Sequence, residues 1–259
     1  MEIITKYMKK NPYYNDNRWI YGNNFKGFFL HSVGCSQPNP DVFYRTWNDI
    51  NYKNAGISGF IGEDKVYITA PCFEEKGRVK RMPHAGKTAT NNGYIGFEMC
   101  EPNTIKYTGG SSFICLDKAK AQEFVKKVYN NAVELFAELC KFHNKNPLDK
   151  GVIYSHDEGR RLGIATAHYD PEHLWKGLDL PYTMETFRKD VYNKMHENDK
   201  YIKNFYDLPD WARKDMRELL DSNIINGGTD ASYDNDDINM YLSDIKTVII
   251  CKRLVESKL

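Results

Sequence analysis

The segment SHDEGRRLGIATAHYDPEHLW, residues 155–175, concentrates side chains that bind metals or transfer protons. It holds three of the chain's seven histidines, and two aspartates lie beside them: His156, His168, His173, Asp157 and Asp170. Imidazole nitrogens and carboxylate oxygens are zinc ligands, and a catalytic zinc takes three protein ligands and leaves one position for water. The segment can therefore supply part of a metal site, with the remainder coming from elsewhere in the chain.

Two strand ends can complete such a site. The alternating segment KGFFLHS (26–32) predicts a strand that carries His31 near its end, and VIYS (152–155) predicts a strand that delivers His156. Neighbouring strands of one sheet bring such residues together, and a loop folding back can add Asp170 as the third ligand. A single histidine at a strand end is more often structural, so the spacing alone leaves both readings open.

The elements that must position these residues form an α/β pattern. Further strands are predicted at AGISGFI, KVYIT and YIGFEMC, and in the last of these Glu98 lies opposite the apolar face. A buried acid on a strand is costly unless it is paired or faces a cleft. Helices are predicted after the N-cap Asp117, with an apolar stripe at helical spacing, and over residues 184–195.

The chain divides into a large and a small part. The α/β pattern extends over residues 1–197, residues 198–208 resemble a linker, and residues 209–259 predict two helices joined by a Gly/Asp-rich turn. A helical module of this size is near the lower limit for independent stability. We therefore expect it to dock on another surface or to self-associate.

Composition and charge exclude several classes of function. The 259 residues include 36 basic and 35 acidic side chains, a net charge of +1, without the basic excess typical of nucleic-acid binders. No apolar run reaches the roughly 20 residues that cross a bilayer, so we expect no membrane insertion. The N-terminus MEIITKYMKKNPYYNDN is polar and does not read as a secretory signal, so we expect synthesis and accumulation in a cytoplasm.

Four motifs occur in a fixed order: FFLHS, HAGKTATNNGYIGFEMCEP, YSHDEG and HYDPEHLW. This ordered set resembles the zinc-dependent N-acetylmuramoyl-L-alanine amidases of the peptidoglycan-recognition-protein superfamily, which includes phage lysins. The resemblance covers about residues 25–195. It implies a mixed central β-sheet flanked by helices, a Zn²⁺ cofactor and bacterial peptidoglycan as the partner.

The resemblance also implies roles for individual residues. His31, His156 and Asp170 match the three zinc ligands, and Glu98 matches the acid that activates water. His168 stands where the family often has a lysine that stabilises the oxyanion. This departure leaves the electrophilic role open.

Substrate contacts are less sharply indicated. In the resembled family the His-Ala-Gly stretch lines the substrate groove, which makes His84 and, further along the same motif, Asn92 candidate substrate-binding residues. A histidine that only packs a loop explains His84 equally well. Arg160 is a candidate for contacting stem-peptide carboxylates, although a solvated loop residue is an equally good interpretation.

The leading functional hypothesis is an endolysin that hydrolyses the amide bond between N-acetylmuramic acid and L-alanine. Such a lysin is made in the host cytoplasm and reaches the wall once another protein permeabilises the membrane, and the C-terminal module would bind the wall. The alternative is a non-catalytic peptidoglycan-recognition protein on the same fold. Such proteins lose a zinc ligand, and the presence of all of His31, His156, Asp170 and Glu98 argues against that alternative. A metal-dependent deacylase acting on another acylated amine is a third hypothesis.

Overall fold

The computed structural model describes residues 1–89, 93–225, 227 and 236–256, and it divides into two compact units. The first unit is Met1–Met195 and the second is His196–Leu259. The division falls close to the end of the α/β pattern expected from the sequence. Each unit is described by itself below.

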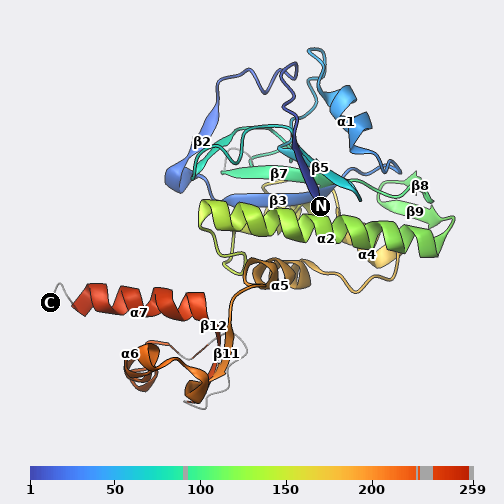
Figure 1. Cartoon of the computed structure of the whole chain (residues 1–259). Helices are drawn as coiled ribbons and strands as arrows, with labels where there is room; N and C mark the ends of the chain where they lie inside the picture. The colour runs from blue at the N-terminus through green and yellow to red at the C-terminus, as the bar shows by residue number, and fades with distance from the viewer. Residues whose placement is uncertain (90–92, 226, 228–235, 257–259) are drawn as a thin grey trace. The chain divides into compact units, whose positions relative to one another are not determined.

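A six-stranded sheet forms the centre of the first unit, in the order β1-β5-β4-β7-β3-β10 (Figure 1). Its strands are β1 (Glu2–Thr5), β3 (Gly27–Ser32), β4 (Gly59–Ile61), β5 (Lys65–Ile68), β7 (Tyr94–Met99) and β10 (Ile153–Ser155). All neighbouring strands are parallel except β4 and β5, which form an antiparallel pair. The sheet is therefore mixed, as the sequence analysis predicted.

Helix α2 (Lys118–His143) covers one face of the sheet (Figure 1). It begins where the sequence predicts, because the Asp117 side chain accepts a hydrogen bond from the backbone N–H of Lys120. Its apolar stripe packs on the strands: the Phe136 ring lies 5.8 Å from that of Phe28 on β3 and 5.5 Å from that of Phe97 on β7. Helix α5 (Met184–Met195), also predicted, packs against α2.

Several short elements surround this core and are not among the elements that the sequence analysis predicts. They are η1 (Gly22–Asn24), α1 (Pro40–Trp47), α3 (His156–Arg161), α4 (Glu172–Gly177), and the antiparallel pairs β2 (Trp19–Tyr21) with β6 (Arg78–Lys80) and β8 (Ile105–Gly109) with β9 (Ser112–Cys115). Most contain few buried residues, so their hydrophobic pattern is weak.

The second face of the sheet carries polar groups beside a small apolar cluster. Strand β3 alternates as expected: Phe28 and Leu30 enter the main core, whereas Phe29 packs with Tyr94 and three alanines on the other side. His31 continues the Phe29 face, and Glu98 lies beside it on β7. The sheet face away from α2 therefore carries the buried polar pair His31 and Glu98.

The second unit has its own elements and its own apolar core. It comprises β11 (Tyr201–Asn204), η2 (Phe205–Asp207), α6 (Asp210–Asp221), β12 (Asp237–Tyr241) and α7 (Leu242–Glu256), with β11 and β12 antiparallel. The expectation of a linker over 198–208 is wrong for most of that segment, because Ile202, Phe205 and Leu208 enter this core. Two helices are present as predicted, but a two-stranded sheet accompanies them.

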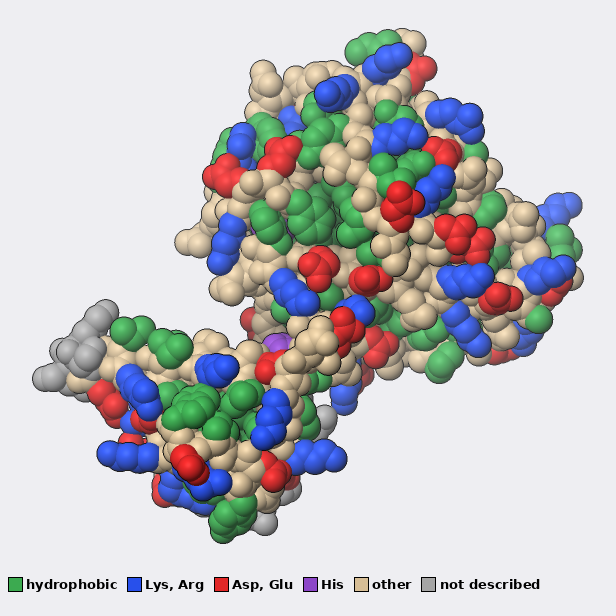
Figure 2. Space-filling view, viewed as in Figure 1, with side chains coloured by type: hydrophobic (Ala, Val, Ile, Leu, Met, Phe, Trp, Pro, Cys, Tyr) green, Lys and Arg blue, Asp and Glu red, His purple; other side chains and the backbone are tan. Residues whose placement is uncertain are grey.

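Charged side chains of both signs are interspersed over the visible face of the molecule (Figure 2). This distribution agrees with the nearly balanced 36 basic and 35 acidic residues. Among the helices in the described part of the chain, none combines the length and the apolar character that a membrane span requires.

Candidate functional site

Strand register brings the first candidate residues together. Strand β3 lies between β7 and β10, and all three are parallel, so their carboxyl ends meet at one edge of the sheet. His31 is paired in register with Glu98, and Ser155 at the end of β10 is paired with Leu30. His156 follows directly as the first residue of α3, whose start is fixed by a capping box between Ser155 and Glu158.

Asp170 reaches the same place from the loop that follows α3. One carboxylate oxygen, Oδ2, accepts a hydrogen bond of 3.2 Å from the backbone N–H of Ser32, the residue after His31. The backbone carbonyl of Asp170 also accepts from the N–H of Asp157. These two contacts hold the loop against the ends of β3 and α3, and the side chain is only 6% exposed.

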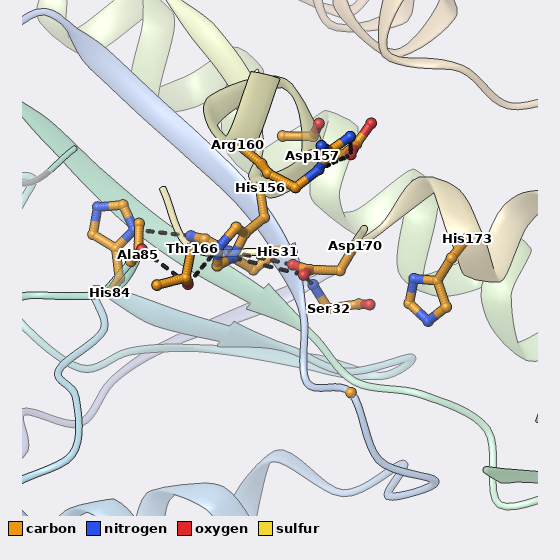
Figure 3. Close-up of polar contacts among 12 residues, drawn as sticks. His31, Ser32, His84, Ala85, His156, Asp157, Arg160, Thr166, Asp170 and His173 are labelled. Atoms are coloured by element: carbon orange, nitrogen blue, oxygen red, sulfur yellow. Dashed lines mark hydrogen bonds and ion pairs between the residues drawn. The ribbon is translucent and has the colours of Figure 1, made fainter. Parts of the chain in front are cut away.

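Three donor atoms converge at this point, as Figure 3 shows. The Nδ1 atoms of His31 and His156 lie 3.0 Å apart. Asp170 Oδ2 is 3.3 Å from His31 Nδ1, and Asp170 Oδ1 is 3.6 Å from His156 Nδ1. All three residues are buried, and within the described residues they form the one group of at least three His, Cys, Asp or Glu side chains with spacing suited to a metal ion.

The far sides of both imidazole rings are also occupied. His31 Nε2 is 2.8 Å from His84 Nδ1, and His84 Nε2 is 3.2 Å from the backbone carbonyl oxygen of Tyr94. His156 Nε2 is 3.2 Å from the hydroxyl of Thr166, which in turn donates to the carbonyl of Ala85. Each ring is thus held by one hydrogen-bonded chain on the side away from the convergence point.

Glu98 lies beside the three donor atoms with one oxygen unpaired. Its Oε2 atom is buried and has no hydrogen-bond partner in the structure, although the residue is 9% exposed overall. The pKa of Glu98 is raised to about 7, mainly by burial; His31 opposes this rise, and the carboxylates of Asp170 and Glu101 add to it. An unpaired buried carboxylate is costly in a folded protein, which is typical of groups retained for chemistry.

The other residues singled out from the sequence lie at different distances from this centre. The His168 ring is exposed and lies with its centroid 4.8 Å from that of His156. Arg160 pairs with Asp157 and stacks over Tyr169. His173 lies apart from the three converging side chains in Figure 3. Asn92 is outside the described residues.

The sequence analysis missed two polar groups near the centre. Thr166 contacts His156 through its hydroxyl. Glu101 is fully buried and accepts hydrogen bonds from the backbone N–H of Gly34 and the hydroxyl of Tyr107. Glu101 lies just beyond the carboxyl end of β7, the strand that carries Glu98. An acid at this position is visible in the sequence and could have been named as a candidate site residue. Thr166 had no such signal, because a loop threonine is common.

The fold and the site together define a class of protein: a mixed α/β sheet with a buried His–His–Asp donor set, of the kind that metal-dependent hydrolases use. Comparison with known families makes this specific. The profile of the N-acetylmuramoyl-L-alanine amidase family matches residues 21–173, and the chain belongs to this family. The reaction of these amidases is hydrolysis of the amide bond between N-acetylmuramic acid and L-alanine in peptidoglycan.

Comparison with solved structures supports the fold through one of the two matches described here, that with the higher TM-score. The hydrolase AmiA of Staphylococcus aureus, solved in complex with its ligand, superimposes with a TM-score of 0.53 at 15% identity, covering 76% of this chain and 85% of that one. A mutant endolysin from Bacillus subtilis is 19% identical, with a TM-score of 0.45 over 74% of this chain and 99% of that one. A search of curated protein sequences finds no significant match.

Proposed function

We propose that the chain is a zinc-dependent N-acetylmuramoyl-L-alanine amidase of the endolysin type, with His31, His156 and Asp170 as the zinc ligands. The observation that carries the proposal is the spacing of the three donor atoms. Ligands held about 2.0–2.1 Å from a tetrahedral zinc lie about 3.3 Å from one another. Here the two imidazole Nδ1 atoms lie 3.0 Å apart, Asp170 Oδ2 lies 3.3 Å from Nδ1 of His31, and Asp170 Oδ1 lies 3.6 Å from Nδ1 of His156.

Hydrogen-bond accounting at His156 supports a cation at this point. The Thr166 hydroxyl gives its single proton to the carbonyl of Ala85, so it accepts a proton from His156 Nε2. A neutral His156 therefore has a lone pair on Nδ1, and this lone pair faces His31 Nδ1 and the Asp170 carboxylate. Electron-rich atoms at such short range repel one another unless a proton or a metal ion lies between them, and a metal ion can accept a lone pair from all three side chains at once.

The buried acid has a clear part in the chemistry. When bound, zinc makes a water molecule acidic enough to attack near neutral pH and polarises the scissile carbonyl. Glu98 takes the proton of the attacking water through its unpaired Oε2 and passes it to the leaving amine of L-alanine. Glu98 thus acts first as a base and then as an acid, and it is not itself a ligand.

His168 is the proposed partner of the developing oxyanion. Its ring lies next to His156 and is exposed, so it can meet a substrate carbonyl that approaches the metal side of the site. An N–H of this ring can donate to the oxyanion, as the lysine at this position does in the resembled family. Arg160 remains a candidate for stem-peptide carboxylates, although its guanidinium is already paired with Asp157.

The second unit is the proposed wall-binding module. Its surface carries the exposed aromatic rings of Tyr206 and Trp211, which are 69% and 44% exposed. Aromatic rings with a polar edge suit contact with sugars and peptides of the wall. The double variant Tyr206→Ala, Trp211→Ala should lower co-sedimentation with purified walls while leaving hydrolysis of soluble muropeptides unchanged.

One assay tests the proposed function directly. Purified cell walls are digested with the protein, with the protein after removal of metal by a chelator, and with the metal-free protein after zinc is restored. We expect new amino groups of L-alanine, lost after chelation and recovered with zinc. Release of reducing sugars would point to glycan cleavage, and binding without any new end group would identify a non-catalytic recognition protein.

A further inference from the structure

The loop His84–Gly86 contacts His31 directly and reaches His156 through Thr166, although it lies far from both histidines in the sequence. We propose that this loop is the positioning element of the centre: His84 orients His31, and the carbonyl of Ala85 orients His156 through Thr166. This inference rests on the proposed metal site. It assigns His84 a role different from the substrate contact that family resemblance implies.

The proton positions around His84 follow from its partners. A backbone carbonyl oxygen only accepts, so His84 Nε2 carries a proton and donates it to Tyr94. The other contact, between His84 Nδ1 and His31 Nε2 at 2.8 Å, needs one proton between the two atoms. If His31 is to offer Nδ1 to a metal as a neutral ring, that proton lies on His31 Nε2 and His84 Nδ1 accepts it.

Ala85 serves the second histidine in a parallel way. Its carbonyl oxygen accepts from both the backbone N–H and the hydroxyl of Thr166, at 2.9 and 3.2 Å. The Thr166 hydroxyl is thereby oriented so that its oxygen faces His156 Nε2. These two series of hydrogen bonds leave the Nδ1 atoms of His31 and His156 directed toward the carboxylate of Asp170 (Figure 3).

Two glycines make room for this arrangement. A Cβ atom at Gly96 on β7 would lie 2.7 Å from Cγ and Nδ1 of His84, so only glycine lets the imidazole pack against the strand. At Gly86 the backbone has a φ of +68°, and a Cβ would lie 2.5 Å from Cγ2 of Thr166. His84 is also packed against the ring of Phe29. The loop is therefore fitted to the two supporting side chains.

Direct zinc binding tests the proposal. Metal-free wild type, His84→Leu, His84→Asn and Thr166→Val are titrated with zinc against a chromophoric chelator, and folding is checked by circular dichroism. We expect a dissociation constant about 10- to 100-fold higher for His84→Leu and for Thr166→Val, the usual effect of removing a hydrogen bond behind a metal ligand. His84→Asn should recover part of the affinity, because Oδ1 can accept the proton of His31 Nε2.

A matched control is His143, another buried histidine. Its two ring nitrogens contact backbone groups of Gly77 and Cys72 and none of the proposed zinc ligands. His143→Leu should lower stability and leave zinc affinity unchanged. The cobalt-substituted protein gives an independent readout, because the visible spectrum of Co²⁺ should change in His84→Leu and not in His143→Leu.

The outcomes distinguish the proposed role of the loop from the proposed metal site on which it rests. A folded His84→Leu protein with wild-type zinc affinity and an unchanged cobalt spectrum would overturn the role of the loop while the metal site stands. Absence of stoichiometric zinc binding by the wild type, or binding unaffected by His31→Ala, would overturn the metal site itself. Equal losses of affinity in His84→Leu and His143→Leu would also overturn the role of the loop, because they would trace to general destabilisation.

Discussion

The two faces of the central sheet differ in what their buried side chains do. On the face covered by α2, Phe28 and Phe97 meet Phe136 with no polar atom to satisfy. On the other face, the same two strands present His31 and Glu98, which are buried side by side. Adjacent residues of one strand thus enter two environments, because successive side chains of a strand point to opposite sides.

In each of these strands, residues on one face stabilise the fold, and residues on the other face supply the candidate catalytic groups. Burial of apolar surface against α2 stabilises the fold. Burial of Glu98 with an unpaired oxygen costs stability and is compatible with a folded protein only because the apolar face offsets it. Substitutions on the two faces should therefore change different measured quantities.

The largest loss of activity is expected for Asp170→Ala. This variant removes one of three proposed zinc ligands, so zinc content of the purified protein should fall well below one ion per chain. Because metal polarisation contributes several kcal/mol to the transition state, kcat/KM on cell walls should fall roughly 10⁴-fold or more. Metal analysis by mass spectrometry checks the first effect, and unchanged zinc stoichiometry would remove Asp170 from the ligand set.

A smaller loss is expected for Glu98→Gln, which keeps the shape of the side chain and removes its basicity. The kcat should fall about 10²- to 10⁴-fold, the usual contribution of a positioned acid–base group. Zinc content should remain at the wild-type value, and the thermal midpoint should stay the same or rise because an unpaired buried carboxylate is gone. Wild-type turnover in this variant would contradict the proton-transfer role.

The next effect in size is that of His168→Ala. If the ring donates a hydrogen bond to the oxyanion, kcat should fall about 10²-fold with little change in KM. The variant His168→Lys restores the residue type of the resembled family and should recover activity. Steady-state kinetics on a soluble muropeptide measure both, and wild-type kcat in His168→Ala would show that the exposed ring has no part in the reaction.

The smallest effect on activity is expected on the opposite face of β7. Ile95→Val removes one methylene from a fully buried side chain and should lower the free energy of unfolding by about 0.5–1.5 kcal/mol. Activity per folded molecule and zinc content should not change. Chemical denaturation with parallel activity assays checks this, and a loss of kcat here would show that the two faces are not independent.

Much of this arrangement could be predicted from the sequence where a strong local signal exists. Alternation in FFLHS and YIGFEM placed Phe28 and Glu98 on their faces, and Asp117 marked the start of α2. The family match and the mixed sheet confirm the fold class and the amidase assignment. The roles of the individual site residues remain proposals.

Features that depend on contacts distant in sequence were not predictable. Strand β1 lies at the sheet edge, where exposed residues mask the alternation, and β11 has only Ile202 as a buried residue. The contacts of His84 and Thr166 depend on how two loops meet behind the histidines. A sequence pattern records the type of such residues but not their partner.

X-ray absorption spectroscopy of the zinc-loaded protein tests the central claim most directly, because it counts and identifies the ligands of the ion. We predict two imidazole nitrogens with oxygen completing the shell, at about 2.0–2.2 Å, and no sulfur. In His31→Ala and in His156→Ala one imidazole should be lost from the shell. A zinc–sulfur distance of about 2.3 Å, or a shell without histidine, would contradict the account.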